Sequence, residues 1–254
     1  MTDKSPVKGW CPGAHRPMMS GDGLIVRIRP RLGRITKRQA LGLCDISRVL
    51  GNGIIDLTSR ANLQLRGIAE HDHQTVLDQL LALDVLDPTP DGEARRNITV
   101  TPTWTADDLT HRLHDAICAR LGELPALPAK MGIAIDTGPH RLLLTTSADF
   151  RIERGVDAPL ILRADGADTG CPITEATAID ALIALANWFV ETNGAAAKRM
   201  APHIAQTPLA KAWTTAAPSP AGAPLTPGRS SSGHILGAPF GSIEAAALAA
   251  LLQD

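Results

Sequence analysis

The stretch GIIDLTSRANLQLRG, residues 53–67, decides how the first part of this chain folds. Apolar or small residues alternate with polar ones along its whole length. A period of two is typical of a β-strand that packs one face on a core and leaves the other face polar. The pattern therefore predicts one long strand. The residues predicted on its polar face are Asp56, Thr58, Arg60, Asn62, Gln64 and Arg66.

The residue types on this polar face indicate a binding surface. A solvated strand face commonly mixes Lys, Glu, Thr and Ser, whereas this one carries two arginines and two amides close together. Guanidinium groups bind carboxylates in a bidentate manner, and same-face neighbours on a strand lie about 6.5–7 Å apart. Such a row suits a flat ligand that carries several carboxylates. On periodicity alone, the alternative is an ordinary solvated face.

The segments around this stretch predict the order strand, helix, strand, helix. Residues 23–30 alternate like a strand, and Thr36 with Gln39 forms the capping box of a helix. A second helix is expected at residues 72–83. This order is half of a ferredoxin-like sandwich, and we expect that unit to span residues 18–88.

The rest of the chain predicts a mixed α/β unit over residues 91–213, a linker at 214–232 and a final strand and helix at 233–254. The strands expected in the mixed unit are 98–103, 131–136, 141–147, 150–154 and 159–164, and the helices are 105–121 and 174–192. The linker is rich in Pro, Ala, Gly and Ser, and we expect it to lack packing of its own. The final strand and helix must dock on the first unit or receive a partner from another chain.

Composition excludes several functions. The 254 residues carry a net charge of −1, with three Phe, four Trp and no Tyr, which argues against stacking on nucleic acid. The N-terminus lacks the apolar core of a signal peptide and no segment has the length of a membrane span, so we expect a cytoplasmic protein. The cysteines are Cys11, Cys44, Cys118 and Cys171. They form no short ligand spacing, so the residues predict no metal site.

Two segments carry a family resemblance. Thr58 to Gly67 resembles the signature of sulfite and nitrite reductases where a strand passes the tetrapyrrole. The opening, with Cys11-Pro12-Gly13, His15-Arg16-Pro17-Met18 and residues 20–27, resembles precorrin-3B synthases, the cobalamin-pathway members of that family. The resemblance implies an α+β fold, in which a ferredoxin-like half-domain precedes a mixed α/β domain of the nitrite/sulfite reductase type. It also implies oxygen-dependent hydroxylation and lactone formation on precorrin-3A, an oxidoreductase reaction assisted by an iron–sulfur cluster.

The same resemblance implies site residues. Residues 95–98 resemble the family's Arg-Asn-Ile/Val segment and residues 127–131 its Leu-Pro-x-Lys-Phe segment. By this match the catalytic cations are Arg60, Arg96 and Lys130. The residues expected to bind the tetrapyrrole are Thr58, Arg60, Asn62, Gln64, Arg66, Arg96, Asn97 and Lys130. A further lysine of the reductases is Gly132 here, which argues against sulfite reduction.

The chain departs from the family at the cofactor. Family members hold a [4Fe–4S] cluster with four cysteines in two closely spaced pairs, and this sequence has neither pair. Three interpretations therefore stay open: a precorrin-3B synthase-like enzyme completed by a second chain, a non-catalytic tetrapyrrole-binding half or subunit, and a fragment of a sirohaem reductase. The tetrapyrrole is a substrate in the first interpretation and a prosthetic group in the last.

Overall fold

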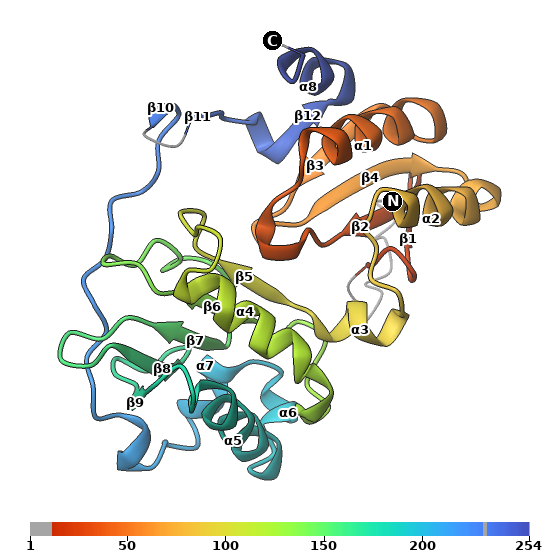
Figure 1. Ribbon diagram of the computed structural model, residues 1–254. Coiled ribbons are helices and arrows are strands. Elements are labelled where there is room, and N and C mark those ends of the chain that lie inside the picture. Colours follow the sequence, from red (N-terminus) through yellow and green to blue (C-terminus); the bar gives the residue numbers. More distant parts are fainter. Residues whose placement is uncertain (1–11, 231–232, 254) are drawn as a thin grey trace, which may run out of the picture.

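The computed structural model describes residues 12–230 and 233–253, which form two five-stranded sheets (Figure 1). The first sheet is antiparallel and contains, in spatial order, β1 (Met18–Ser20), β2 (Gly23–Ile28), β4 (Leu63–Ile68), β3 (Ile54–Leu57) and β12 (Ser242–Glu244). The second contains β5 (Ile98–Val100), β6 (Ile133–Asp136), β7 (Phe150–Glu153), β8 (Leu160–Ala164) and β9 (Cys171–Ile173). With helices packed on both sheets, the chain has the α+β fold that the sequence predicts.

The prediction of one long strand at residues 53–67 is wrong, because the chain reverses in the middle of this stretch. β3 and β4 pair antiparallel with Ile55 opposite Leu65, and a turn joins them. The amide of Thr58 donates to the carbonyl of Asn62 at 2.9 Å. The Thr58 Oγ1 in turn accepts from the amide of Asn62 at 3.2 Å. Such side-chain to backbone bonds compete with a continuous strand, and the alternation runs on through the turn without marking it.

The first sheet packs its apolar face against helices. The buried residues of this face are Leu24, Val26, Ile28, Ile55 and Leu65, and α1 (Lys37–Leu50) and α2 (His73–Ala82) cover them. The predicted capping box of α1 is confirmed: the Thr36 Oγ1 accepts from the amide of Gln39 at 3.2 Å, and the Gln39 Oε1 accepts from the amide of Thr36 at 2.9 Å. The opposite face carries half-buried Arg27, Asp56, Gln64 and Arg66, and we call it the polar face of the first sheet.

The end of the chain docks back on this unit. β12 pairs with β3, with Ile243 opposite Ile55, and α8 (Ala245–Leu251) packs against α1. Ala245 is fully buried in the first core. Of the two alternatives that the sequence left open, the described residues take the one in which the final strand and helix complete the first sheet.

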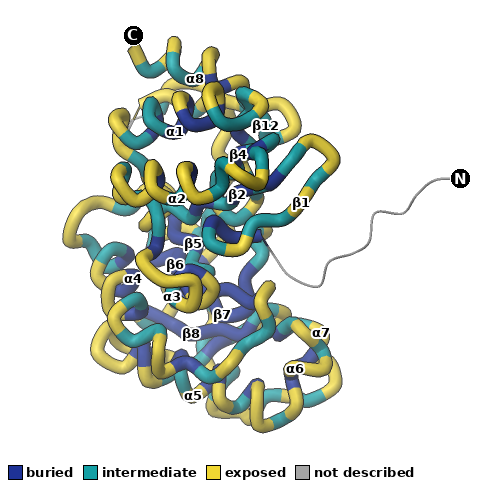
Figure 2. The backbone as a smooth tube through the Cα atoms, turned by 90° about the vertical axis from the view of Figure 1, so that its right-hand side faces the viewer, coloured by how far each residue is buried: buried dark blue, intermediate teal, exposed yellow. Residues whose placement is uncertain are grey.

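The second sheet has its own core on one face. β5, β6 and β7 run parallel, while β8 and β9 are antiparallel to their neighbours. Helices α4 (Leu109–Ala119) and α5 (Ala178–Glu191) pack on the face that holds Phe150 and Leu162. The central strands β6, β7 and β8 are buried along their whole lengths (Figure 2). The remaining short helices are Arg31–Gly33, Glu70–Asp72, α3 (Pro90–Arg95), Leu121–Glu123, α6 (Gly194–Ala197), α7 (Met200–Ile204), Lys211–Trp213 and Pro239–Gly241.

The strand predicted at residues 141–147 is a loop that covers the other face of the second sheet. Arg141 forms an isolated bridge with Ala221, and side chains bind several backbone groups of the rest of the loop. The Asp136 Oδ2 accepts from the amides of Leu142 at 2.7 Å and Leu143 at 2.8 Å. Arg151 donates to the carbonyls of Leu143 and Thr146 at 3.0 and 2.7 Å. The prediction of a strand here is wrong, and of the three leucines in this stretch only Leu143 is buried.

The expected linker also packs. Residues 216–221 cross the second sheet unit, with isolated bridges from Ala216 to Gly170, from Pro218 to Gly155 and from Ala221 to Arg141. Beyond them, β10 (Gly228–Ser230) and β11 (Gly233–Ile235) form a small hairpin. The prediction of a segment without packing is wrong here because backbone bridges need no apolar side chains. The boundaries 18–88, 91–213, 214–232 and 233–254 stay predictions.

Asp136 makes stability depend on pH. Burial raises the pKa of this carboxyl, and the neighbouring Glu153 raises it further. The folded chain therefore holds this proton to higher pH than the unfolded chain, so ionisation of Asp136 costs stability as the pH rises above about 4. We expect the free energy of unfolding of Asp136→Asn, relative to wild type, to increase from pH 4 to pH 7 in urea titrations. The exposed Asp45→Asn serves as a control with a flat difference. The same flat difference for Asp136→Asn would contradict this assignment.

Among the described residues, no helix combines the length and apolar composition that a membrane span requires.

Candidate functional site

The polar face of the first sheet joins side chains from three strands. Gln64 on β4 lies opposite Arg27 on β2 and opposite Asp56 on β3. Arg27 donates to the Gln64 Oε1 through Nε at 3.1 Å and Nη2 at 2.6 Å. The sequence analysis did not include Arg27 among the site residues. The alternation of residues 23–30 could have placed it on the polar side, but its pairing with Gln64 depends on strand order.

Arg66 lies next along this face, between two carboxylates. It donates to the Asp56 Oδ2 at 3.1 Å and to the Asp22 Oδ2 at 3.4 Å. The hydrogen bond that Arg66 donates to Asp56 is the main cause of the raised pKa of Arg66. Burial is the largest single influence on Asp22 and disfavours its charge, but the hydrogen bonds from Arg66, a backbone amide and Ser20, together with the charge of Arg66, outweigh it and lower the pKa of Asp22. The guanidinium is therefore oriented before a ligand arrives, and a ligand carboxylate has to compete with these two acids.

The turn between β3 and β4 carries Thr58, Arg60 and Asn62, away from the row formed by Gln64 and Arg66. Thr58 holds the turn through its hydroxyl, and Asn62 is buried at 8% exposure. These two residues therefore shape the loop. Arg60 reaches outward from it.

Arg60 reaches the second unit. Its Nη2 donates to the Ser147 Oγ at 3.1 Å, and the Nη2 of Arg199 donates to the same hydroxyl at 3.1 Å. Arg199 is held by Asp149, whose carboxylate is fully buried, with an Nε to Oδ1 distance of 2.8 Å. Two guanidinium groups thus meet at one hydroxyl across the junction of the two units. No local pattern in the sequence indicates Arg199.

Arg96 serves the structure in this chain. Its side chain is 7% exposed and binds Asp87 through Nε at 2.9 Å and Nη2 at 2.7 Å. The Nη2 also donates to the carbonyl of Arg29 at 2.5 Å. Through the hydrogen bonds of its Nε and Nη2, Arg96 links the first unit to the start of β5.

Asn97 and Gly132 lie against each other. Asn97 donates from Nδ2 to the carbonyl of Met131 at 2.6 Å. A Cβ at Gly132 would lie 2.8 Å from that same Nδ2 and 3.1 Å from the carbonyl oxygen of Asn97. The position where the reductases carry a lysine therefore has no room for a side chain unless Asn97 moves.

This contact predicts a stability difference between two glycines. We expect Gly132→Ala to lower the free energy of unfolding by about 1–3 kcal/mol, because the new methyl overpacks against Asn97. The control is Gly122→Ala, since a Cβ at Gly122 meets no atom within 4 Å. Urea denaturation of both variants measures the difference. Equal stabilities of the two variants would refute the close packing.

Lys130 is exposed, and the described residues give it no hydrogen bond or ion pair. It lies in a turn closed by the amide of Met131 and the carbonyl of Pro128 at 2.9 Å. The preceding Ala129 lines two open pockets of about 240 and 360 Å³. Among the predicted cations, Lys130 is thus the one whose side chain is uncommitted.

The eight predicted residues fall into three groups. Gln64 and Arg66 share the polar face, Thr58, Arg60 and Asn62 share the turn, and Arg96, Asn97 and Lys130 lie before and beside the second sheet. Within the described part of the chain, no hydrogen bond or ion pair joins one group to another.

The cysteines do not fit a cluster of four thiolate ligands. Cys44 is buried in the first core, whereas Cys171 packs against the second, and Cys118 lies on α4 with its Sγ 3.6 Å from the Nε2 of His114. Burial raises the pKa of all three thiols. Cys11 lies outside the described residues. In the part of the chain that the structure covers, no three His, Cys, Asp or Glu side chains gather as a metal site.

Comparisons with known proteins agree with this architecture. Residues 16–83 match the family described as nitrite/sulfite reductase ferredoxin-like half domain. A precorrin-3B synthase from a Sinorhizobium species is 32% identical over 164 residues, which cover 60% of this chain and 34% of the relative. The match thus spans about a third of that protein's length.

Among solved structures, the NirA protein of Mycobacterium tuberculosis has the same fold. The TM-score is 0.61 at 17% identity, over 91% of this chain and 50% of that one. At this identity the likeness speaks for the fold alone. Taken with the sequence matches, it supports the expected arrangement of a half-domain followed by a mixed α/β domain. Residues 16–83 thus match the nitrite/sulfite reductase ferredoxin-like half-domain family, and the chain is similar in sequence to part of a precorrin-3B synthase.

Proposed function

We propose that this chain binds a polycarboxylate tetrapyrrole as part of a precorrin-3B synthase-like oxidoreductase of cobalamin biosynthesis. The observation that carries the proposal is the polar face of the first sheet. There Arg27, Gln64 and Arg66 form a row of carboxylate-binding groups within the segment that matches the family. Precorrin-3A, a flat macrocycle with acetate and propionate side chains, is the proposed ligand.

Binding on this face uses groups that are already in place. Arg66 stands oriented by Asp56 and Asp22, so a ligand carboxylate gains a fixed guanidinium without paying to order a flexible side chain. Gln64 fixes Arg27 in the same way. Arg60, at the tip of the hairpin, extends the row toward the second unit. The chain would thus orient the macrocycle by its rim, which is where the carboxylates lie.

In this proposal, the described residues bind and orient the tetrapyrrole. In the proposed whole enzyme, oxygen-dependent hydroxylation and lactone formation follow on the bound tetrapyrrole. The dispersed cysteines favour a second candidate, in which this chain is a non-catalytic tetrapyrrole-binding half and another polypeptide supplies the iron–sulfur chemistry. The tight contact between Gly132 and Asn97 argues against a sirohaem sulfite reductase fragment.

A titration with uroporphyrin, a stable polycarboxylate tetrapyrrole, tests the proposed function. We expect saturable quenching of tryptophan fluorescence with uroporphyrin and none with its methyl ester, because the ester offers no carboxylates to the arginines. Equal binding of acid and ester, or binding of neither, would refute the proposal. Iron and acid-labile sulfide in the anaerobically purified chain separate the two candidates, since the non-catalytic half contains neither.

A further inference from the structure

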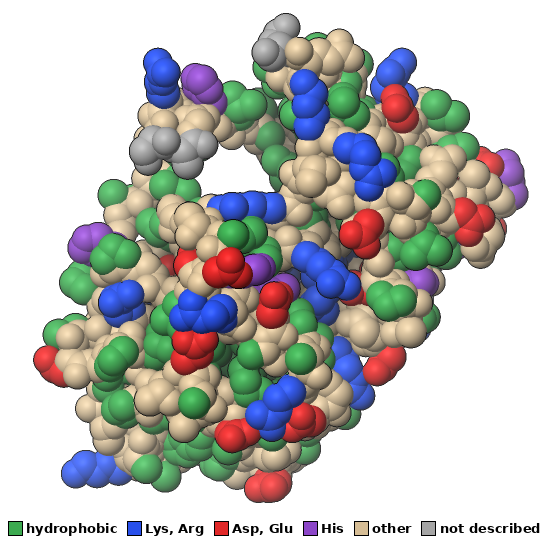
Figure 3. Space-filling view, in the orientation of Figure 1, with side chains coloured by type: hydrophobic (Ala, Val, Ile, Leu, Met, Phe, Trp, Pro, Cys, Tyr) green, Lys and Arg blue, Asp and Glu red, His purple; other side chains and the backbone are tan. Residues whose placement is uncertain are grey.

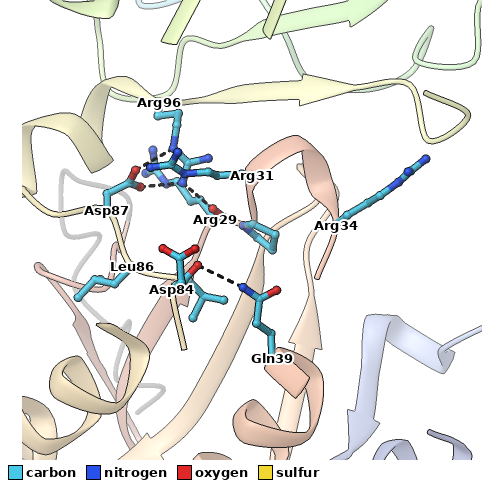
Figure 4. Close-up of a pocket in the computed structure, with 10 residues that line it drawn as sticks. Arg29, Arg31, Arg34, Gln39, Asp84, Leu86, Asp87 and Arg96 are labelled. Atoms are coloured by element: carbon cyan, nitrogen blue, oxygen red, sulfur yellow. Dashed lines mark hydrogen bonds and ion pairs between the residues drawn. The ribbon is translucent and has the colours of Figure 1, made fainter. Parts of the chain in front are cut away.

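A small pocket lies at the junction of the two units, on the helix-covered side of the first sheet (Figure 4). Its volume is about 170 Å³. The lining residues that carry polar side chains are Arg29, Arg31, Arg34, Gln39, Asp84, Asp87 and Arg96. Gln39 belongs to α1, and Asp84 follows α2, so the pocket is separate from the polar face with Gln64 and Arg66.

The pocket has an excess of positive charge. Four guanidinium groups and two carboxylates line it, and Asp87 is fully engaged by Arg96. Arg34 turns away in Figure 4 and lies over the ring of Trp104, 3.7 Å from its centroid. Asp84 is the other acid that lines the pocket, and Glu93, which is not among the lining residues, also acts on the charge of Arg29. The space-filling view likewise shows Lys and Arg side chains gathered around the junction of the units (Figure 3).

Arg29 is incompletely bonded. It donates from Nη1 to the carbonyl of Glu93 at 2.6 Å, but its Nε is buried and has no partner among the described residues. Burial lowers the pKa of this guanidinium, although an arginine remains charged under these conditions. A buried N–H of a cation without an acceptor is costly. Within the described residues, the Nε of Arg29 therefore has no acceptor.

Arg31 supplies the accessible cation. It is exposed, and the described residues give it no hydrogen bond or ion pair. The left-handed backbone of Leu32, with φ of 55°, belongs to the short helix Arg31–Gly33, which packs against β5. Arg31 thus begins a short helix that lies at the junction of the two units.

We propose that this pocket binds a small oxyanion, the phosphate or carboxylate group of a free small molecule, with Arg29 and Arg31 as its hydrogen-bond donors. The volume excludes the macrocycle, since pockets for drug-sized ligands measure about 300–1,000 Å³. Because Arg29 and Arg31 are brought together only in the folded chain, a bound anion stabilises that state by mass action. This site goes beyond the proposed tetrapyrrole function and does not depend on it.

Calorimetric titration of the full chain with inorganic phosphate and with malonate, at constant ionic strength, tests this proposal. We expect Arg31→Gln to weaken oxyanion binding roughly three- to ten-fold, because one charged donor is lost. Asp84→Asn should tighten binding, since it removes the opposing carboxylate; Asn tolerates the left-handed backbone found there, with φ of 56°. The control is Arg229→Gln on the distant β10, which removes an exposed charge and should leave binding unchanged.

The outcomes separate clearly. Binding of phosphate or malonate that responds to Arg31 and Asp84 in opposite directions supports the site, and the better of the two anions identifies the group. Binding no stronger than that of chloride would overturn it, as would equal affinities of Arg31→Gln and Arg229→Gln. Uroporphyrin affinity of Arg31→Gln is expected to match wild type, so failure here is distinguishable from failure of the tetrapyrrole proposal.

Discussion

Replacing Arg96 with Ala is expected to lower the free energy of unfolding by about 3–5 kcal/mol, the usual cost of breaking a buried ion pair from one side. Asp87 is 8% exposed, and it would lose both hydrogen bonds that now satisfy its carboxylate. The carbonyl of Arg29 would lose its donor as well. Urea denaturation of wild type and variant measures this loss.

The neighbouring arginine provides the matched control. Arg95 pairs with Asp91 at 2.9 Å, and the Asp91 side chain is 78% exposed. Exposed pairs of this kind contribute about 0–1 kcal/mol. Arg95→Ala is therefore expected to lose far less stability than Arg96→Ala. Similar small losses in both variants would mean that Arg96 is not committed to Asp87 in solution and is available for a ligand, as the family resemblance implies.

Replacing Arg66 with Ala is expected to weaken uroporphyrin binding by about 1.5–3 kcal/mol, the contribution of a charge-assisted hydrogen bond. The free protein should remain folded, because the side chain is half-exposed and its ion pairs with Asp22 and Asp56 lie at the surface. The fluorescence titration described above measures the affinity, and circular dichroism of the free variant checks the fold.

Arg112 provides the control for this variant. It is an exposed arginine of α4 that pairs with Glu175 at 2.6 Å, far from the first sheet. Arg112→Ala removes the same charge and should leave uroporphyrin affinity at the wild-type value. Equal weakening in both variants would indicate a general effect of charge, and no weakening in Arg66→Ala would remove Arg66 from the site.

Local signals predicted much of the fold. The capping box at Thr36 and Gln39 begins α1, and Asp108 caps α4 by accepting from the amide of His111 at 2.9 Å. Both are contacts within four residues, which a sequence pattern can reveal. The α+β class follows from such elements, because helices and sheets that each have an apolar face must bury those faces against one another.

Contacts between distant residues explain the failures. The chain reverses at Thr58 to Asn62 through hydrogen bonds that preserve the alternation, so the period of two hides the turn. Arg96 matches a family cation, but its partner Asp87 approaches from a loop whose path the pattern does not give. Arg60 and Arg199 both donate to Ser147, although the three residues lie far apart in the sequence. Strand order and loop packing decide these contacts.

Hydrogen exchange of the chain with and without uroporphyrin tests the central claim most directly. If the polar face of the first sheet binds the tetrapyrrole, exchange should slow in the Thr58 to Asn62 turn and in β2 and β4, which carry Arg27, Gln64 and Arg66. Protection confined to the second sheet, or no protection at ligand concentrations that quench fluorescence, would contradict the account.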